Sequence, residues 1–270
     1  MSSSTNQYKR LLLENKGGVL TIMLSSPKRR NAVDGVMHEE LPRALRAAAA
    51  DPSVAVIVLT GDPAGGAFCA GGDIHWVRDA SQTGEGFAKI LREGVEVLRA
   101  IVDAPQPVIS MINGAAVGLG ATLALFADVS FMDEAAKISD PHVGIGVAAG
   151  DGGAVIWPLL IGPNRAKEFL MTGDALTGAE AASIGLINHA VPARDLNSRT
   201  YAFAERMLTG PRLAIEFTKR SVNLYLRMIL NQVIDASVSL EGISFRTADH
   251  DEAVRAFAAK EKPRFGQLKG

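Results

Sequence analysis

The sequence has very little cysteine, almost no net charge and no long apolar run, and each lack excludes a class of protein. Cys69 is the only cysteine among 270 residues, so an intramolecular disulfide is impossible and a zinc site built from cysteines is disfavoured. The 28 basic and 29 acidic residues nearly cancel, whereas a nucleic-acid binder needs clustered Lys and Arg. We therefore expect no nucleic-acid partner. We also expect no metal, because the histidines show no metal-ligand spacing.

The sequence also shows no targeting signal and no membrane-spanning segment. No run reaches about eighteen uninterrupted apolar residues, the length a spanning helix needs. The polar start MSSSTNQ has neither a signal-peptide core nor the arginine pattern of a transit peptide. We expect a cytoplasmic protein with no membrane partner. Its 47% hydrophobic content is ordinary for a globular fold, and its length allows a substantial core.

Strand and helix patterns alternate up to about residue 190, and helices alone follow. Strand-like runs cover 10–14, 19–25, 54–59, 108–112 and 187–191, and a glycine-rich turn makes the first two a hairpin. Helical spacing covers 34–50, 86–102, 164–171, 178–184, 196–208 and 211 to about 250. Pro42 predicts a kink or break in the first helix, and the apolar stripe of the second is predicted to be core. The pattern indicates a mixed α/β core over 1–195 and a helical region over 196–270.

The stretch 108–162 carries the first sign of chemistry. A β-branched run ends in an Asn-Gly pair, and the sequence GLG at 118–120 then opens a helical run of small residues. The first amides of a helix lack internal partners, so such a bend directs free N–H groups toward a developing negative charge. His142 and Asp151 follow within the same stretch. One segment therefore supplies both an oxyanion binder and an acid/base group.

A second turn of the same type comes earlier in the chain. Ala70, Gly71 and Gly72 follow an apolar run and precede Asp73, which is predicted to cap a helix starting near Ile74. If the two turns come from neighbouring layers of the fold, they can bring two backbone amides onto one oxygen.

The candidate side chains each have a functional and a structural interpretation. His142 titrates near neutral pH and can act as a general base if Asp151 fixes its tautomer. The alternatives are a structural histidine and an aspartate that caps the helix beginning at GGAVIW. The basic loop of Lys28, Arg29 and Arg30 is either a solvated loop or a clamp for an anionic tail of a ligand.

Five motifs in order resemble the enoyl-CoA hydratase/isomerase family, the crotonase superfamily. They are SSPKRRNAV, VIVLTGDPAGGAFCAGGDI, PVISMINGAAVGLGATLALFADV, GGAVIWPLLIGPNRAKEFLMTGDALTGAEAASIGLIN and DEAVRAFAAKEKPRF, and they cover nearly the whole chain. The resemblance implies a crotonase-like spiral of ββα units with a helical C-terminal trimerisation region. It also implies a homotrimer or homohexamer, and acyl-CoA thioester substrates with coenzyme A as part of the substrate and no separate cofactor.

Carried over by position, the resemblance assigns residues to roles. The oxyanion amides belong to Ala70 and Leu119, and two such amides stabilise an enolate oxygen by about 3–4 kcal/mol each. The substrate-binding positions are Lys28, Arg29, Arg30, Gly71, Gly72, Asp73, Thr122, Phe257 and Lys260. Of these, the basic loop and the two C-terminal residues match positions that contact coenzyme A.

The sequence departs from the family at the catalytic positions. Typical hydratases of the family carry two glutamates there, and this chain has Thr122 and His142. The segment DPHVGIGVAAGDGGAVIWPLLIGPNR also resembles 6-oxocamphor hydrolase, a family member that cleaves a carbon–carbon bond of a β-diketone with a matching His and Asp.

We therefore expect an enoyl-CoA hydratase-like lyase in which His142 is the acid/base and Asp151 orients it. Thr122 either positions water or substrate or simply packs on its helix. The alternatives are hydrolysis of a β-diketone or β-dicarbonyl thioester, an enoyl-CoA isomerase, and a family member used as a binding or RNA-associated protein.

Overall fold

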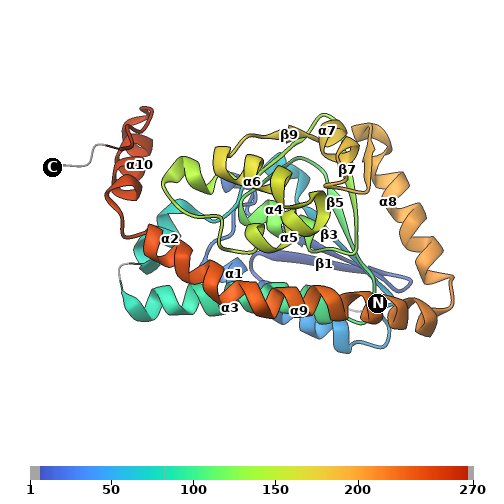
Figure 1. The fold of residues 1–270 in the computed structure, drawn as a ribbon. Helices are drawn as coiled ribbons and strands as arrows, with labels where there is room; N and C mark the ends of the chain where they lie inside the picture. The colour runs from blue at the N-terminus through green and yellow to red at the C-terminus, as the bar shows by residue number, and fades with distance from the viewer. Residues whose placement is uncertain (1–6, 82, 267–270) are drawn as a thin grey trace.

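The computed structural model describes residues 7–81 and 83–266, which form two sheets surrounded by helices (Figure 1). Within these residues, six strands form the larger sheet in the order β1-β2-β3-β5-β7-β10, and four form the smaller one in the order β4-β6-β8-β9. The strands are β1 Leu11–Lys16, β2 Val19–Leu24, β3 Val56–Gly61, β4 Ala67–Cys69, β5 Val108–Ile112, β6 Ala115–Val117, β7 Val129–Asp133, β8 Lys137–Ser139, β9 Leu176–Thr177 and β10 His189–Val191.

The helices connect these strands and dominate the last part of the chain. The α-helices are α1 Gly35–Ala50, α2 Ile74–Ser81, α3 Gly84–Asp103, α4 Leu119–Leu125, α5 Gly153–Ile161, α6 Pro163–Thr172, α7 Gly178–Ser183, α8 Ala193–Leu208, α9 Arg212–Ser244 and α10 Ala248–Ala259. Short 3-10 turns are η1 Pro27–Arg29, η2 Pro63–Gly65 and η3 His142–Ile145. No helix in the described part of the chain is both long and apolar enough to cross a membrane.

The larger sheet is buried on both faces, which explains the continuous apolar runs of its central strands. The β1–β2 hairpin is antiparallel, and β2, β3, β5, β7 and β10 run parallel to one another. Along β3, Val56 and Val58 belong to the core beneath α8, whereas Ile57 and Leu59 belong to the main core on the other face. This alternation follows from the two-residue period of a strand.

The main chain repeats one unit, in which a strand of the large sheet is followed by a short strand of the small sheet and then a helix. The units are β3-β4-α2, β5-β6-α4 and β7-β8-η3 with α5. This architecture confirms the predicted spiral of ββα units. Because β4, β6 and β8 are parallel neighbours, their carboxyl ends lie at the same edge of the small sheet. The turns after these three strands therefore meet in space.

Several details differ from the sequence prediction. The helix over 34–50 begins at Gly35 with Asp34 as its cap and is not broken at Pro42. The final helical pattern is not one helix to residue 250, because α9 ends at Ser244 and α10 begins at Ala248. The short strands β4, β6, β8 and β9 were not predicted, because two or three residues are too few to show a period.

The C-terminal helices take different places around the core. Helix α8 packs on β7, β5, β3 and β2, while α9 lies along α3 and also contacts α5, as Figure 1 shows for the long orange helix beside the teal one. Helix α10 stands at the end of the molecule and contacts η3. The division at residue 195 into a core and a helical region stays a prediction.

A substitution at Gly120 in α4 tests how closely the short strand β4 packs against this helix. A Cβ atom added at Gly120 would lie 2.4 Å from the carbonyl oxygen of Cys69 and 2.8 Å from its Cβ. We expect Gly120→Ala to lower the free energy of unfolding by about 1–3 kcal/mol, the usual effect of overpacking. Urea unfolding measures it. Gly84→Ala is the control, since a Cβ at Gly84 meets nothing within 4 Å, and equal effects of the two variants would contradict the tight contact.

Candidate active site

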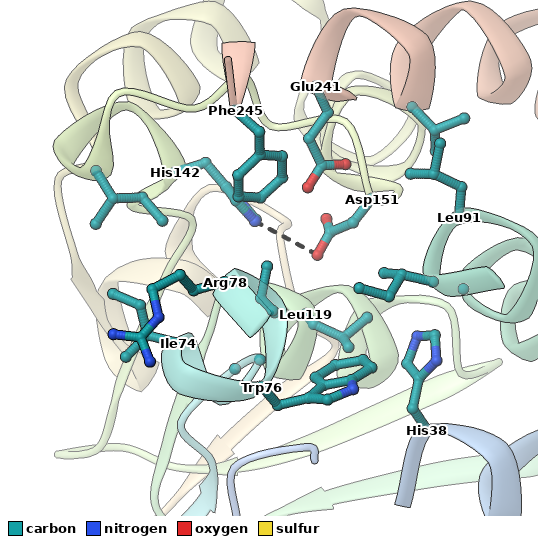
Figure 2. Close-up of a pocket in the computed structure, with 18 of the residues that line it drawn as sticks. His38, Ile74, Trp76, Arg78, Leu91, Leu119, His142, Asp151, Glu241 and Phe245 are labelled. Atoms are coloured by element: carbon teal, nitrogen blue, oxygen red, sulfur yellow. Dashed lines mark ion pairs between the residues drawn. The ribbon is translucent and has the colours of Figure 1, made fainter. Parts of the chain in front are cut away.

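A cavity of about 380 Å³ opens at the edge where the three short strands end. Backbone at 70–72 and 117–119 forms one wall, and apolar side chains of α2, α3 and α9 form much of the rest. Figure 2 shows His142, Asp151, Glu241 and Phe245 at one end of this cavity and Trp76 and His38 at the other. A largely apolar pocket with a few converging polar groups is the usual form of a small-molecule site.

The two glycine turns predicted from the sequence are in direct contact. Gly71 has φ +93°, and a Cβ atom there would lie 2.9 Å from the carbonyl oxygen of Val117 and 4.0 Å from the amide nitrogen of Leu119. Gly118, with φ +52°, precedes α4 as its N-cap. Both positions need glycine, since L side chains rarely adopt positive φ and the backbones leave no room for a Cβ at Gly71.

The two candidate oxyanion amides differ in how free they are. Leu119 is the first residue of α4, where amides lack intrahelical partners, and it lines the cavity. Ala70 also lines the cavity, but its amide donates a hydrogen bond to the carbonyl of Arg30 at 3.2 Å. The Ala70 amide therefore already has a backbone partner, and its role in an oxyanion hole stays a prediction.

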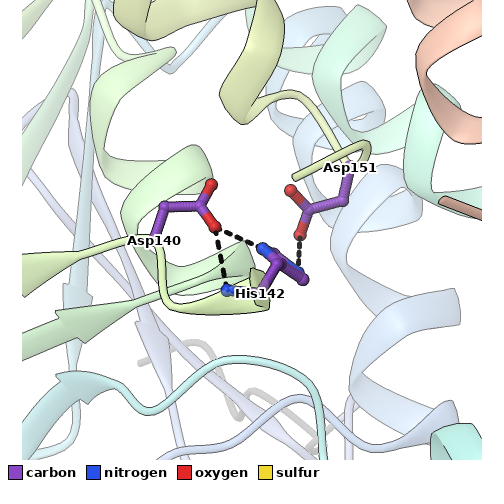
Figure 3. Close-up of side chains that lie close together, drawn as sticks. All are labelled: Asp140, His142 and Asp151. Carbon is purple, nitrogen blue, oxygen red and sulfur yellow. Dashed lines mark hydrogen bonds and ion pairs between the residues drawn. The ribbon is translucent and has the colours of Figure 1, made fainter. Parts of the chain in front are cut away.

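His142 lies between two carboxylates, as Figure 3 shows. Its Nδ1 is hydrogen-bonded to Oδ1 of Asp140, and its Nε2 is 3.5 Å from Oδ2 of Asp151. Its ring also approaches the second glycine turn, because a Cβ built on Gly118 would lie 3.4 Å from Cε1 of His142. The predicted proximity of His142 and Asp151 is therefore observed, and the imidazole lies beside the proposed oxyanion turn.

Asp140 is the member of this cluster that the sequence analysis missed. Its side chain is fully buried, and of the described residues none hydrogen-bonds to its Oδ2. That oxygen lies against the start of α5, where a Cβ added at Gly153 would be 2.1 Å from it. A helix N-terminus favours a nearby negative charge, so Gly153 allows a carboxylate to sit where the helix dipole stabilises it. The only hint in the sequence is the spacing Asp-Pro-His.

The charged groups of the cluster strongly shift one another's pKa values. Burial lowers the pKa of His142, but the charges of Asp151 and Asp140, together with the Asp140 hydrogen bond, outweigh it and raise the pKa to about 10. Burial raises the pKa of Asp151, although the charge of His142 opposes this. His142 is thus an imidazolium at neutral pH, and at least one of the neighbouring acids tends to hold a proton.

Thr122 does not line the cavity, contrary to its predicted place in the substrate-binding set. The residue is fully buried, and its hydroxyl donates a hydrogen bond of 3.2 Å to Oδ1 of Asp151. Gly152 takes the N-cap position of α5. The Asp151 carboxylate is held from α4 by Thr122, from η3 by His142, and by a backbone hydrogen bond from Gly153 at the start of α5. Thr122 thus acts on the site through Asp151.

The other predicted residues divide between the cavity and its surroundings. Gly71, Gly72 and Phe257 line the cavity. The remaining predicted binding residues are outside its wall: Lys28, Arg29, Arg30, Asp73 and Lys260. Arg29 instead forms an ion pair of 2.9 Å with Asp73, whose other oxygen caps α2 by accepting hydrogen bonds from the amides of His75 and Trp76. Contacts of these residues with coenzyme A stay predictions.

The sequence analysis missed most of the side chains that shape the cavity. Phe87, Ile90 and Leu91 begin the apolar stripe of α3, but they line the cavity, and only the later part of the stripe, such as Leu98 and Ile101, is buried core away from it. The prediction that the whole stripe is core was wrong. Glu241 of α9 was not singled out either, because one glutamate in a long helix resembles a surface residue.

Asp140, His142 and Asp151 are also close enough to be tested as metal ligands, with one ligand atom from each lying within 4.8 Å of the others. In the structure both ring nitrogens of His142 face a carboxylate, so the imidazole is engaged within the cluster. The absence of a metal stays a prediction.

The fold and the cavity define a crotonase-type α/β protein with an acid/base cluster beside two backbone turns. Among solved structures, an enoyl-CoA hydratase/isomerase from Mycobacterium paratuberculosis superposes with a TM-score of 0.87 at 34% identity, covering 92% of this chain and 99% of that one. Among curated proteins, the crotonyl-CoA hydratase of Syntrophomonas wolfei is 31% identical over 96% of this chain and 98% of its own length. The 1,2-epoxyphenylacetyl-CoA isomerase of Escherichia coli is 31% identical over 92% of this chain and 95% of its own length.

The model of the enoyl-CoA hydratase/isomerase family matches residues 14–268. The chain therefore belongs to this family, as the motifs predicted, and family membership indicates an enzyme.

Asp140→Asn tests what keeps His142 charged. The change removes a negative charge bonded to Nδ1, so we expect the pKa of His142 to fall from about 10 by about one to three pH units. NMR titration of the imidazole signals measures it. Asp174→Asn, an exposed site, is the control and should leave His142 unchanged. A His142 pKa that is the same in Asp140→Asn as in the unaltered protein would contradict the assignment.

Proposed function

We propose that this family member is a hydratase-like lyase that adds water across the double bond of a 2-enoyl-CoA thioester. Addition of water at C3 places negative charge on the thioester oxygen, and backbone amides are suited to receive it. One observation carries the proposal: the imidazole of His142 lies against Gly118, directly before the Leu119 amide. The acid/base cluster and the carbonyl-binding turn thus share one cavity wall.

The roles within the cluster follow from which nitrogen faces which carboxylate. Asp140 is buried and bonded to Nδ1, so it orients the ring, a role that the sequence analysis gave to Asp151. His142 then faces Asp151 with its Nε2, and its charge lowers the pKa of the Asp151 carboxyl group. Asp151 keeps access to the cavity and accepts a proton from the attacking water, while Thr122 fixes its second oxygen.

The shape of the cavity supports an acyl substrate. Apolar side chains of α2, α3 and α9 line the space beyond the two glycine turns, including Trp76, Phe87, Leu91 and Val238. A thioester carbonyl at the turns would therefore direct its acyl chain into an apolar pocket. The nucleotide end of coenzyme A would lie outside, toward the basic turn of Lys28, Arg29 and Arg30.

Two alternative reactions would use the same site. An enoyl-CoA isomerase needs only one group that removes a proton from one carbon and returns it to another, and an isomerase is among the relatives. Hydrolysis of a β-diketone or β-dicarbonyl thioester would use water activated at the His142–Asp151 pair. A shifted double bond identifies the first reaction, and carboxylate products identify the second.

We further propose that the protein is cytoplasmic and assembles as a homotrimer or homohexamer. Large apolar side chains exposed along α9 support a subunit contact there: Leu213, Phe217, Val222, Leu224, Tyr225 and Met228.

The proposed function is tested with crotonyl-CoA, by following the loss of absorbance of its conjugated double bond. We expect the unaltered protein to hydrate it. We expect His142→Ala to be slower by about 100- to 10,000-fold, the range for a disabled general base, because the charge of His142 lowers the pKa of Asp151 and keeps it able to accept a proton. His189→Ala, an exposed histidine on β10, is the control. Equal rates for His142→Ala and the unaltered protein would remove His142 from the mechanism.

A further inference from the structure

Glu241 is a buried acid that the proposed roles leave unused. It lies on α9 with only 7% of its surface exposed, and it lines the cavity. Of the residues that the structure describes, none forms an ion pair or a hydrogen bond with its carboxyl group. Figure 2 shows the group directed toward Asp151 and His142. Acidic side chains are rarely buried without a partner, and a titratable group of this kind in a cleft is a candidate for function.

The backbone before Asp151 is shaped to pass over Glu241. A Cβ atom at Gly150 would lie 2.4 Å from Cβ of Glu241 and 2.8 Å from its Oε2, so only glycine fits. The same loop is tied to α9 at Ser244, whose hydroxyl accepts a hydrogen bond of 3.0 Å from the amide of Ala148. These contacts hold Asp151, at the end of the loop, close to the acid of α9.

The surroundings of Glu241 favour its neutral form. Burial raises its pKa to about 8, with Asp151 and Asp140 adding to the rise and His142 opposing it. The other titratable or charged groups on the cavity wall are His38, Arg78 and His250. At neutral pH the site thus contains a carboxylic acid that carries a proton next to a second carboxyl group.

We propose that Glu241 is the catalytic proton donor, and that with Asp151 it forms a two-carboxyl pair from a loop and a distant helix in place of the usual pair at positions 122 and 142. This inference rests on the proposed hydration. The standard reaction needs one group for the water and one for the proton, and these two side chains face the same cavity.

The proposed step balances without any further reactant. Asp151 takes a proton from water as the water oxygen bonds to C3, and the electron pair of the double bond moves through C2 to the thioester oxygen. The carboxylic acid of Glu241 then gives its proton to C2, and the thioester carbonyl re-forms. Asp151 now carries a proton and Glu241 is a carboxylate. Transfer of that proton from Asp151 to Glu241 restores the starting state.

The test uses Glu241→Gln, which keeps the size and polarity of the side chain but carries no transferable proton. We expect its kcat/KM for crotonyl-CoA to fall by at least about 100-fold. In the unaltered protein kcat/KM should decline above a pH of about 8, where Glu241 loses its proton, and the residual activity of the variant should lack this decline. Asp235→Asn, an exposed acid on the same helix, is the matched control.

A second measurement separates this inference from the proposed function. Exchange of the C2 protons of butyryl-CoA with D₂O, followed by NMR, reports proton transfer at C2 without any hydration. We expect the unaltered protein to catalyse the exchange and Glu241→Gln to lose it while retaining binding of butyryl-CoA. Unchanged exchange and hydration in Glu241→Gln would overturn the role of Glu241 alone. Exchange by the unaltered protein without hydration would overturn only the hydratase proposal, and absence of both would overturn the two together.

Discussion

The parallel pairing of β4, β6 and β8 is the constraint on which the site depends. Parallel strands end at the same edge of a sheet, so the turns after these three strands are forced together although they lie far apart in the sequence. The first turn holds Ala70, the second begins α4 at Leu119, and the third leads from Asp140 to His142. The glycines at 71 and 118 then let the backbones approach closely enough to share a cavity wall with the imidazole.

Burial of several acids around a single imidazole is the electrostatic consequence of this arrangement. Three carboxyl groups, of Asp140, Asp151 and Glu241, act on His142, and they cannot all be charged in a buried site at low cost. The imidazolium compensates one charge, and protons held by the acids compensate others. Some groups of the site therefore stay protonated near neutral pH. A reaction that moves a proton between water and carbon needs such a group.

Much of the fold and part of the site could be predicted from the sequence. Glycine-rich turns and small-residue helices have strong local signatures, which is why the two turns at 70–72 and 118–120 were recognised. The roles of Ala70, Leu119 and His142 came from the resemblance to the family. Asp140 could not be assigned, because its role depends on the direction in which a 3-10 turn points it. Glu241 was hidden for a different reason: helical periodicity identifies a face, but it does not reveal what a distant loop places against that face.

Helix α9 can carry a residue of the site because its first half is fixed to the core. The side chain of Lys219 is buried, forms an ion pair of 2.6 Å with Asp128, and donates a hydrogen bond to the carbonyl of Gln106. Asn223 donates one to the carbonyl of Val102. These contacts satisfy groups at the end of α3 and the start of β5 that would otherwise be buried without partners. A helix is stiff over such a length, so anchoring its first half sets the position of Glu241 in its second half. The second half of α9 thus completes the cavity wall although α9 is not part of the small sheet. Polar contacts of its first half, far from the cavity, set its position.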